Sequence, residues 1–165
     1  STACALLLLL SAAPTRAAAP TQAAAPASAS PVAVSTLMAA HLAAYPGGTP
    51  INTNEISYDG GRFIVTLTPP ARWQAYTPDC PSGWFCFYDR VGYGYPRGRL
   101  SDCGWQWLST WAWQYRTESV HYNMSSGATH FYYGSTWLYQ VGTARRTIAD
   151  VSPYRNWADR VNRVC

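Results

Sequence analysis

The residues with the chemistry for catalysis are few and scattered in this chain. Ser119 and His121 are the nearest approach to a nucleophile and its base, but they are merely alternate residues of one strand-like run. No Gly-x-Ser-x-Gly elbow occurs, and the acids have no arrangement typical of a glycosidase. Those acids include Asp79, Asp89, Asp102 and Glu118. The sequence therefore predicts a protein that binds rather than an enzyme.

The cysteines predict structural bridges. Of the five, Cys4 precedes an apolar run that we expect to be removed, which leaves four widely spaced cysteines and three possible pairings. We favour Cys80 with Cys86, which closes a tight loop, and Cys103 with Cys165, which ties the C-terminus to the middle of the domain. Their spacing does not suit zinc, and the three histidines are scattered, so we expect no metal site.

Tryptophans are the best candidates for a binding surface. Trp105 with Trp107, and Trp111 with Trp113, recur with period two, so on a strand each pair would share a face. Such pairs either fill a core or form a stacking platform for sugars or peptides. Trp113 aligns with Trp157 in an internal repeat, which favours a structural role, so Trp105 and Trp107 are the candidate platform.

The N-terminal segment predicts export. Residues 3–13 form an apolar run of signal-peptide length that is too short to span a bilayer. Residues 14–31 consist mostly of Ala, Pro, Thr and Ser without apolar periodicity, which predicts a leader or disordered linker. We therefore expect a secreted, extracellular protein with no membrane association after signal removal.

The charge pattern gives no sign of nucleic-acid binding. All twelve basic residues are Arg, against eight acids. The arginines near the C-terminus are interspersed with acids, which indicates a solvated face rather than a dense basic patch. They are Arg145, Arg146, Arg155, Arg160 and Arg163. No groove-reading motif accompanies them, so we expect no nucleic-acid partner.

One helix and one hairpin are predicted ahead of residue 80. The run 34–44 is rich in helix formers, places Leu37, His41 and Ala44 on one face, and ends at Pro-Gly-Gly. The strand-like runs 55–58 and 62–68 flank Asp-Gly-Gly, which is a strong hairpin signal. Residues 32–79 are therefore expected to form a helix and β-hairpin appendage with a connector.

From residue 80 to 165 the chain predicts an all-β sandwich. Short strand-like runs occur at 85–88, 119–122, 129–133 and 137–141. An offset of 44 residues aligns Gly83 with Gly127, Phe87 with Phe131, Trp113 with Trp157, Arg116 with Arg160 and Val120 with Val164. We interpret this repeat as two related Greek-key motifs, about 80–125 and 126–165.

The sequence FYDRVGY, residues 87–93, followed by Ser119, resembles the βγ-crystallin signature, a hairpin that a later serine closes. The block from CPSGWFCFYDRVGYG to DCGWQWL, with PGGTPINTNEISYDGG upstream, is similar to a secreted bacterial peptidase-inhibitor family whose type member blocks metalloproteinases. The resemblance covers roughly residues 46–165. It implies a βγ-crystallin-like double Greek-key fold.

Calcium is the one candidate cofactor, because many crystallin-type motifs bind it through an Asn/Asp-rich segment. The corresponding segments here, 114–119 and 158–163, contain Arg116 and Arg160 and have lost most of the expected ligands. We therefore expect no bound cofactor.

The resemblance implies a secreted peptidase inhibitor that acts on metalloproteases and blocks their cleft with a rigid loop beside Cys80–Cys86 or in the hairpin 92–98. The candidate interaction residues are Gly92, Tyr93, Gly94, Tyr95 and Arg97. One alternative is a module for extracellular or cell-wall glycans that uses Trp105 and Trp107. Another is a stable structural or toxin-like extracellular domain. The expected partner is accordingly an extracellular protease or, in the alternative, a glycan.

Overall fold

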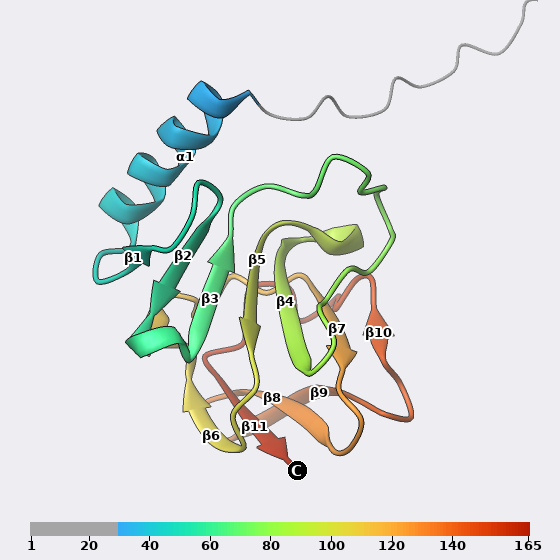
Figure 1. Ribbon diagram of the computed structural model, residues 1–165. Coiled ribbons are helices and arrows are strands. Elements are labelled where there is room, and N and C mark those ends of the chain that lie inside the picture. Colours follow the sequence, from blue (N-terminus) through green and yellow to red (C-terminus); the bar gives the residue numbers. More distant parts are fainter. Residues whose placement is uncertain (1–29) are drawn as a thin grey trace, which may run out of the picture.

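The computed structural model describes residues 30–165, which form one α-helix, three short 3-10 helices and two antiparallel sheets (Figure 1). The prediction of an all-β protein with a short N-terminal helix is confirmed. No helix in this described range is long and apolar enough to cross a membrane. The predicted signal segment, most of the leader and Cys4 lie outside the described residues.

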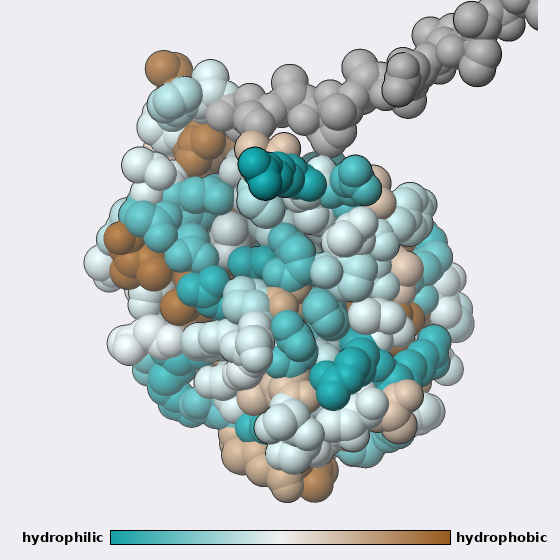
Figure 2. Space-filling model, turned by 45° about the vertical axis from the view of Figure 1, so that its right-hand side comes forward, coloured by the Kyte–Doolittle hydropathy of each residue, from teal (hydrophilic) through white to brown (hydrophobic). Residues whose placement is uncertain are grey.

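Helix α1 spans Pro31–Ala44. It begins where Ser30 Oγ accepts a hydrogen bond from the Ala33 N–H at 3.3 Å, followed directly by Pro31. The buried side of the helix presents His41, with Met38 and Leu42 packed against the main core. Leu37 shares the face of His41, since both line the same groove, but it is 46% exposed. In Figure 2 apolar residues stand out on this N-terminal part of the molecule, at the upper left of the view, and another apolar patch lies at the bottom.

Seven strands form the first sheet, in the order β1-β2-β3-β5-β4-β7-β10, and four form the second, in the order β6-β11-β8-β9. Their bounds are β1 Thr49–Pro50, β2 Glu55–Tyr58, β3 Phe63–Thr66, β4 Trp84–Arg90, β5 Gly94–Leu100, β6 Gly104–Trp107, β7 Ser119–Asn123, β8 Ala128–Tyr133, β9 Thr136–Gly142, β10 Thr147–Ile148 and β11 Arg160–Val164.

Each half of the region after residue 80 sends its third strand to the opposite sheet. In the first half β5 and β7 flank β4, and β6 joins the edge of the second sheet. In the second half β9 and β11 flank β8, and β10 joins the edge of the first sheet. A simple Greek key keeps the third strand beside the second, so the strand order departs from that simple form in the same way twice.

The strand registers show how far the predicted repeat extends. Phe87 and Phe131 lie at equivalent places in β4 and β8, facing Val120 and Val161 respectively on the fourth strand of each half. The offset of 44 residues therefore holds for the first strands only. The structural equivalent of Val120 is Val161 and not Val164, because the second half has the shorter connection to its last strand.

The hairpin β2–β3 belongs to the main sheet. Strand β3 pairs with β5, with Phe63 opposite Leu100 and Val65 opposite Gly98. Phe63 and Val65 are fully buried in the core that also holds the residues after position 80. The expected division into an appendage and a separate domain therefore does not describe the packing, because one core spans both.

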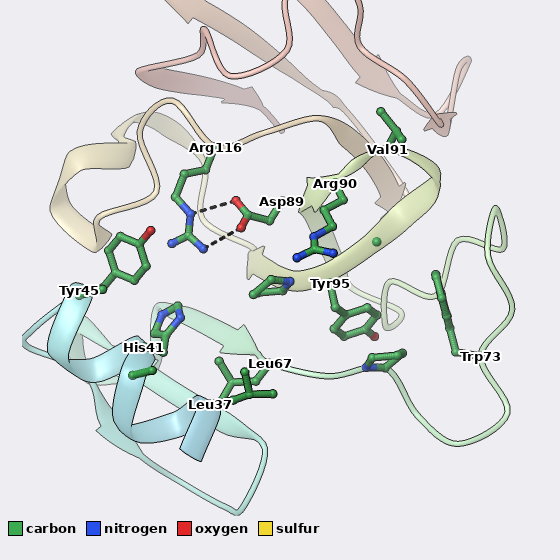
Figure 3. A pocket seen from close by; sticks show the side chains of 15 residues that line it. Leu37, His41, Tyr45, Leu67, Trp73, Asp89, Arg90, Val91, Tyr95 and Arg116 are labelled. Atoms are coloured by element: carbon green, nitrogen blue, oxygen red, sulfur yellow. Dashed lines mark hydrogen bonds and ion pairs between the residues drawn. The ribbon is translucent and has the colours of Figure 1, made fainter. Parts of the chain in front are cut away.

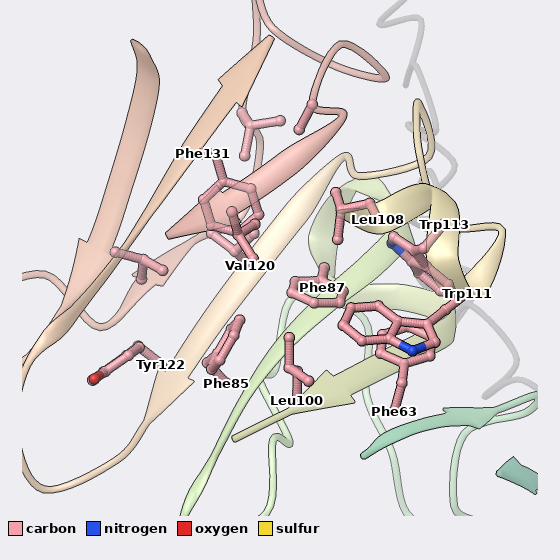
Figure 4. Packing of buried hydrophobic residues seen from close by; sticks show 14 of the residues in the cluster. Phe63, Phe85, Phe87, Leu100, Leu108, Trp111, Trp113, Val120, Tyr122 and Phe131 are labelled. Atoms are coloured by element: carbon pink, nitrogen blue, oxygen red, sulfur yellow. The ribbon is translucent and has the colours of Figure 1, made fainter. Parts of the chain in front are cut away.

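Aromatic rings form the centre of that core (Figure 4). Phe63 stacks on Trp111 at a centroid distance of 4.8 Å and on Phe87 at 5.8 Å. Phe87 then meets Phe131 edge to face at 6.0 Å, across the two sheets. Such ring pairs stabilise the fold beyond the free energy gained by burying apolar area. Because they have preferred geometries, they fix how the two sheets face one another.

Both favoured disulfides are present. Cys80 and Cys86 have Cα atoms 5.6 Å apart, and the Cα atoms of Cys103 and Cys165 lie 5.9 Å apart. The second bridge ties the end of β11 to the residue just ahead of β6.

Gly83 and Gly127 provide a matched test of the packing. Both have a positive φ, +82° and +81°, but a Cβ on Gly83 meets nothing within 4 Å, whereas one on Gly127 would lie 2.0 Å from the Val164 carbonyl oxygen. We expect Gly83→Ala to lower the free energy of unfolding by about 1 kcal/mol. Gly127→Ala should lower it by about 3 kcal/mol or more, because the backbone of β11 must also move. Urea unfolding of the two variants measures both values, and equal losses would contradict this packing.

Candidate functional site

The predicted interaction residues do not form an exposed loop, and this part of the prediction needs correction. Tyr93, Tyr95 and Arg97 are 4%, 8% and 6% exposed, and Gly92 is buried as well. Gly94 is half-buried at the start of β5. Strand β5 lies between β3 and β4 in the first sheet, and from Arg97 to Leu100 its backbone is paired on both sides.

The carboxylate of Asp79 explains why these side chains point inward. Tyr88 O–H donates to Asp79 Oδ1 at 2.8 Å, and Tyr95 O–H donates to Oδ2 of the same carboxylate. The Arg97 guanidinium lies 3.2 Å from Asp79 Oδ1 and also donates to Thr66 Oγ1 at 3.1 Å. Burial is the main cause that raises the pKa of both tyrosines, so they remain neutral donors to the acid.

Ser119 and His121 serve the fold. Ser119 Oγ accepts the Tyr93 N–H at 3.0 Å and donates to the Arg90 carbonyl at 2.7 Å, which closes the β4–β5 turn from β7. His121 Nδ1 accepts the Cys80 N–H at 3.0 Å. The two side chains are therefore bound to backbone groups on separate segments and do not form a nucleophile with its base.

The connector between β3 and β4 is the exposed segment beside the first disulfide. Most of residues 69–79 are exposed, including Arg72 and Tyr76. Trp73 anchors the segment by packing edge to face on Tyr95 at 6.0 Å, and the Tyr76 N–H donates to the Gly92 carbonyl at 2.9 Å. Its C-terminal end leads directly into Cys80.

A groove of about 700 Å³ lies between helix α1, the connector and the β4–β5 turn (Figure 3). Leu37, Leu67 and Trp73 are among the side chains that line it. Three charged side chains line it, Asp89, Arg90 and Arg116. Arg116 and Asp89 form a bidentate ion pair with contacts of 3.0 and 3.2 Å.

The Arg116 guanidinium contacts one carboxylate and two aromatic rings. Besides Asp89, its guanidinium lies 4.2 Å from the ring centroids of both Tyr45 and Trp113. This arginine stands in the segment where the crystallin-type motif would place calcium ligands. Among residues 30–165 no three potential metal-ligating His, Cys, Asp or Glu side chains come together.

The outward side of the second sheet carries a second candidate site, which we call the aromatic face. It consists of Trp105, Trp107, His130, Tyr132, Trp137, Gln140, Arg160 and Asn162. The strand registers arrange these side chains in two rows that run across all four strands. One row is Trp107, Arg160, Tyr132 and Trp137, and the other is Trp105, Asn162, His130 and Gln140.

The rings of this face are open to solvent. Trp105, Trp107 and Trp137 are 58%, 53% and 52% exposed. Trp105 contacts Tyr132 at a centroid distance of 4.9 Å, and the Arg160 guanidinium lies 4.3 Å from the Trp107 ring. Trp105 and Trp107 therefore do share an exposed face, as their period of two predicts, while Trp111 and Trp113 are buried.

Sequence reasoning missed most of the aromatic face. Tyr132, Trp137 and Asn162 come from strands far apart in the chain, and only the cross-strand register brings them beside Trp105. Alternation within β8 and β11 was the one available signal, since it separates outward Tyr132 from inward Phe131. The sequence itself does not specify which strands are neighbours.

Comparison of the chain with known proteins gives no match to a family model, to a curated protein or to a solved structure.

His41 predicts a loss of stability in acid. Burial, together with the nearby Arg116 charge, lowers its pKa from 6.5 to about 4, so folding favours the neutral imidazole. This contribution is complete above pH 6.5 and is lost as the pH falls through that value toward 4. We expect the free energy of unfolding to drop by roughly 2 kcal/mol between pH 7.5 and 4.5 on account of His41. Urea unfolding of His41→Gln should show a smaller drop, and an unchanged drop would assign the effect to other groups.

Proposed function

We propose that this chain is a non-catalytic extracellular protein that binds glycans on the aromatic face. The observation that carries the proposal is the pair of cross-strand rows, in which three exposed tryptophans and a tyrosine lie among side chains that form hydrogen bonds. A sugar presents apolar C–H faces and a rim of hydroxyls. Aromatic rings match the first, and Arg, Asn, Gln and His match the second.

The shape of the face favours an extended chain over a small ligand. The rows cross four strands, and three gaps of about 4.8 Å give a width of roughly 14 Å. Pockets for small ligands enclose most of the ligand surface. On this face the three tryptophans are each more than half exposed, so a polysaccharide lying along it fits better than a buried monosaccharide.

The sheet also holds the rings in place before a ligand arrives. Phe131 and Val161, on the inward side of the same strands, are fully buried. The Cys103–Cys165 bridge fixes the end of β11. Preorganised contacts lose little conformational entropy on binding, which supports affinity from a modest number of rings. The two bridges are also typical of proteins in an oxidising compartment, which supports an extracellular setting.

Substitution in the face provides the test. We expect the protein to be retained on at least one insoluble polysaccharide such as cellulose, chitin or peptidoglycan. Trp107→Ala and Trp137→Ala should each weaken retention by about tenfold, since each removes a stacking ring. Tyr76→Ala is the matched control, because this exposed ring lies on the connector, away from the face. Depletion assays measure the bound fraction, and absence of retention on all polymers tested would reject the proposal.

A second candidate function is peptidase inhibition, which the resemblance to the inhibitor family implies. The observation that favours it is the connector 69–79, an exposed segment held at one end by the Cys80–Cys86 bridge and in its middle by Trp73. Binding segments are commonly loops that a rigid scaffold positions. This segment replaces the buried residues 92–97 as the site of contact with a protease.

Titration of a thermolysin-like and a subtilisin-like protease with the oxidised protein tests this second function. We expect a stoichiometric loss of peptidase activity, and replacement of Arg72 and Gln74 in the connector by Glu should abolish it. Trp107→Ala, on the opposite sheet, should inhibit like the parent protein. Full activity at a large molar excess of the parent protein would exclude inhibition of both enzymes.

A further inference from the structure

A second hollow lies beyond the end of β8, and aromatic rings form most of its wall. Tyr115, Tyr133, Asn156 and Trp157 line it, with a volume of about 460 Å³. The Tyr133 ring stands between the other two, with centroid distances of 6.2 Å to Tyr115 and 6.3 Å to Trp157 and ring planes inclined by 58° and 61°. These three rings are each about half exposed, between 47% and 52%. The inclined planes make a notch rather than a flat platform.

Two residues of the wall hold an unusual backbone conformation. Tyr115 and Asn156 have φ values of +60° and +59°, in the left-handed region, which asparagine tolerates but a bulky residue such as tyrosine seldom adopts. Backbone hydrogen bonds fix both, since the Tyr115 N–H donates to the Ala158 carbonyl at 2.9 Å and the Asn156 N–H to the Thr117 carbonyl at 3.0 Å. Such conformations cluster at sites where a side chain must point in a particular direction.

A carboxylate without an ion pair stands behind the hollow. Seven of the eight acids contact an arginine within 4 Å, and among residues 30–165 Glu118 is the one that does not. Its Oε1 accepts the Asn156 side-chain N–H at 2.9 Å, and its Oε2 accepts the Val91 N–H at 3.1 Å. The negative charge of Glu118 is therefore placed one side chain behind the aromatic wall.

The arginines close in sequence to the hollow contact other groups. Arg116, which follows Tyr115, pairs with Asp89. Arg155 pairs with Asp150, and Arg160 lies over the Trp107 ring and contacts Asp159 at 3.4 Å. Elsewhere in the described chain, guanidinium groups cover the rings of Tyr45, Trp84, Tyr95, Trp107 and Trp113. The rings of Tyr115, Tyr133 and Trp157 have no such guanidinium partner among residues 30–165.

We infer that this hollow binds an organic cation of the quaternary ammonium class. Ring faces attract a cation within about 6 Å of their centroids, and a trimethylammonium group suits them because it is weakly hydrated and carries no hydrogen-bond donors. The nearby Glu118 carboxylate adds a favourable potential. A primary ammonium has three donors to satisfy, and the uncharged acceptors in the wall are the Asn156 side-chain carbonyl and two tyrosine hydroxyls. This inference is independent of glycan binding on the aromatic face.

Choline and its uncharged isostere 3,3-dimethylbutan-1-ol separate attraction to a cation from simple apolar contact. We expect choline to saturate the protein in the millimolar range, measured by NMR shifts of the Asn156 backbone N–H, which every variant retains, and the isostere to bind about tenfold more weakly. Trp157→Leu keeps an apolar side chain but removes the ring, and it should weaken choline binding about tenfold. Glu118→Gln keeps hydrogen-bonding capacity and should weaken it several-fold.

Trp137→Ala, on the aromatic face, is the matched control and should bind choline like the parent protein. Urea unfolding of each variant shows whether the fold is retained, and Tyr133→Phe, which removes only a hydroxyl, provides a second conservative variant that should keep binding. Equal affinity for choline and the isostere, unchanged binding by Trp157→Leu, or no saturation of the parent protein by choline would each overturn the inference. Because the glycan assay uses a different surface, either proposal can fail without the other.

Discussion

A continuous line of ring contacts through the core is the interaction on which the rest of this structure depends. It runs from Trp111 through Phe63 and Phe87 to Phe131, and Phe131 then stacks on Tyr139 at 4.6 Å. These rings come from the hairpin, both sheets and the turn after β6. Dispersion and ring geometry act together in such a line, so moving one element disturbs all the others. The N-terminal hairpin is thereby part of the same folding unit as the two sheets.

The aromatic face and the core are two sides of the same strands. In β8, Phe131 points into the line of rings and Tyr132 points to solvent, and in β11 Val161 and Arg160 do the same. A close-packed interior resists small displacements, and it therefore holds the outward rings at fixed distances. The sheet that carries the aromatic face has only four strands. Each half of the chain contributes a strand to the other half's sheet, β6 and β10, and these strands hold the two sheets together.

Local signals in the sequence were sufficient for much of the fold. The helix, the hairpin, the strands around Phe87 and Phe131 and both disulfides follow from caps, turns and spacing. Strand β5 was missed because Gly94, Pro96 and Gly98 are typical of loops. The structure gives another reason for Gly98, since a Cβ there would lie 2.5 Å from the Phe63 ring. The same loop-like pattern led to the incorrect prediction of an exposed interaction segment.

Features that depend on strand register could not be predicted from the sequence. The 44-residue offset paired Trp113 with Trp157, yet Trp113 is fully buried and Trp157 is 52% exposed, because the second half is shorter before its last strand. Arg163 was expected on a solvated face, but it is 8% exposed and donates to the Ser101 carbonyl at 2.7 Å. A shift of one residue in the pairing of a strand exchanges its inward and outward side chains. The local sequence does not specify which strand is its neighbour.

Because β11 lies in the middle of the second sheet, the aromatic face is complete only when this strand is in place. This strand follows all the others in the chain, and it lies between β6 and β8, so the two rows remain interrupted until residues 160–164 arrive. A chain that lacks residues 160–164 therefore presents only separate fragments of the surface. Truncation by a few residues at the C-terminus removes the middle of both rows at once, whereas a loss of the same length at the N-terminal end of α1 leaves them intact.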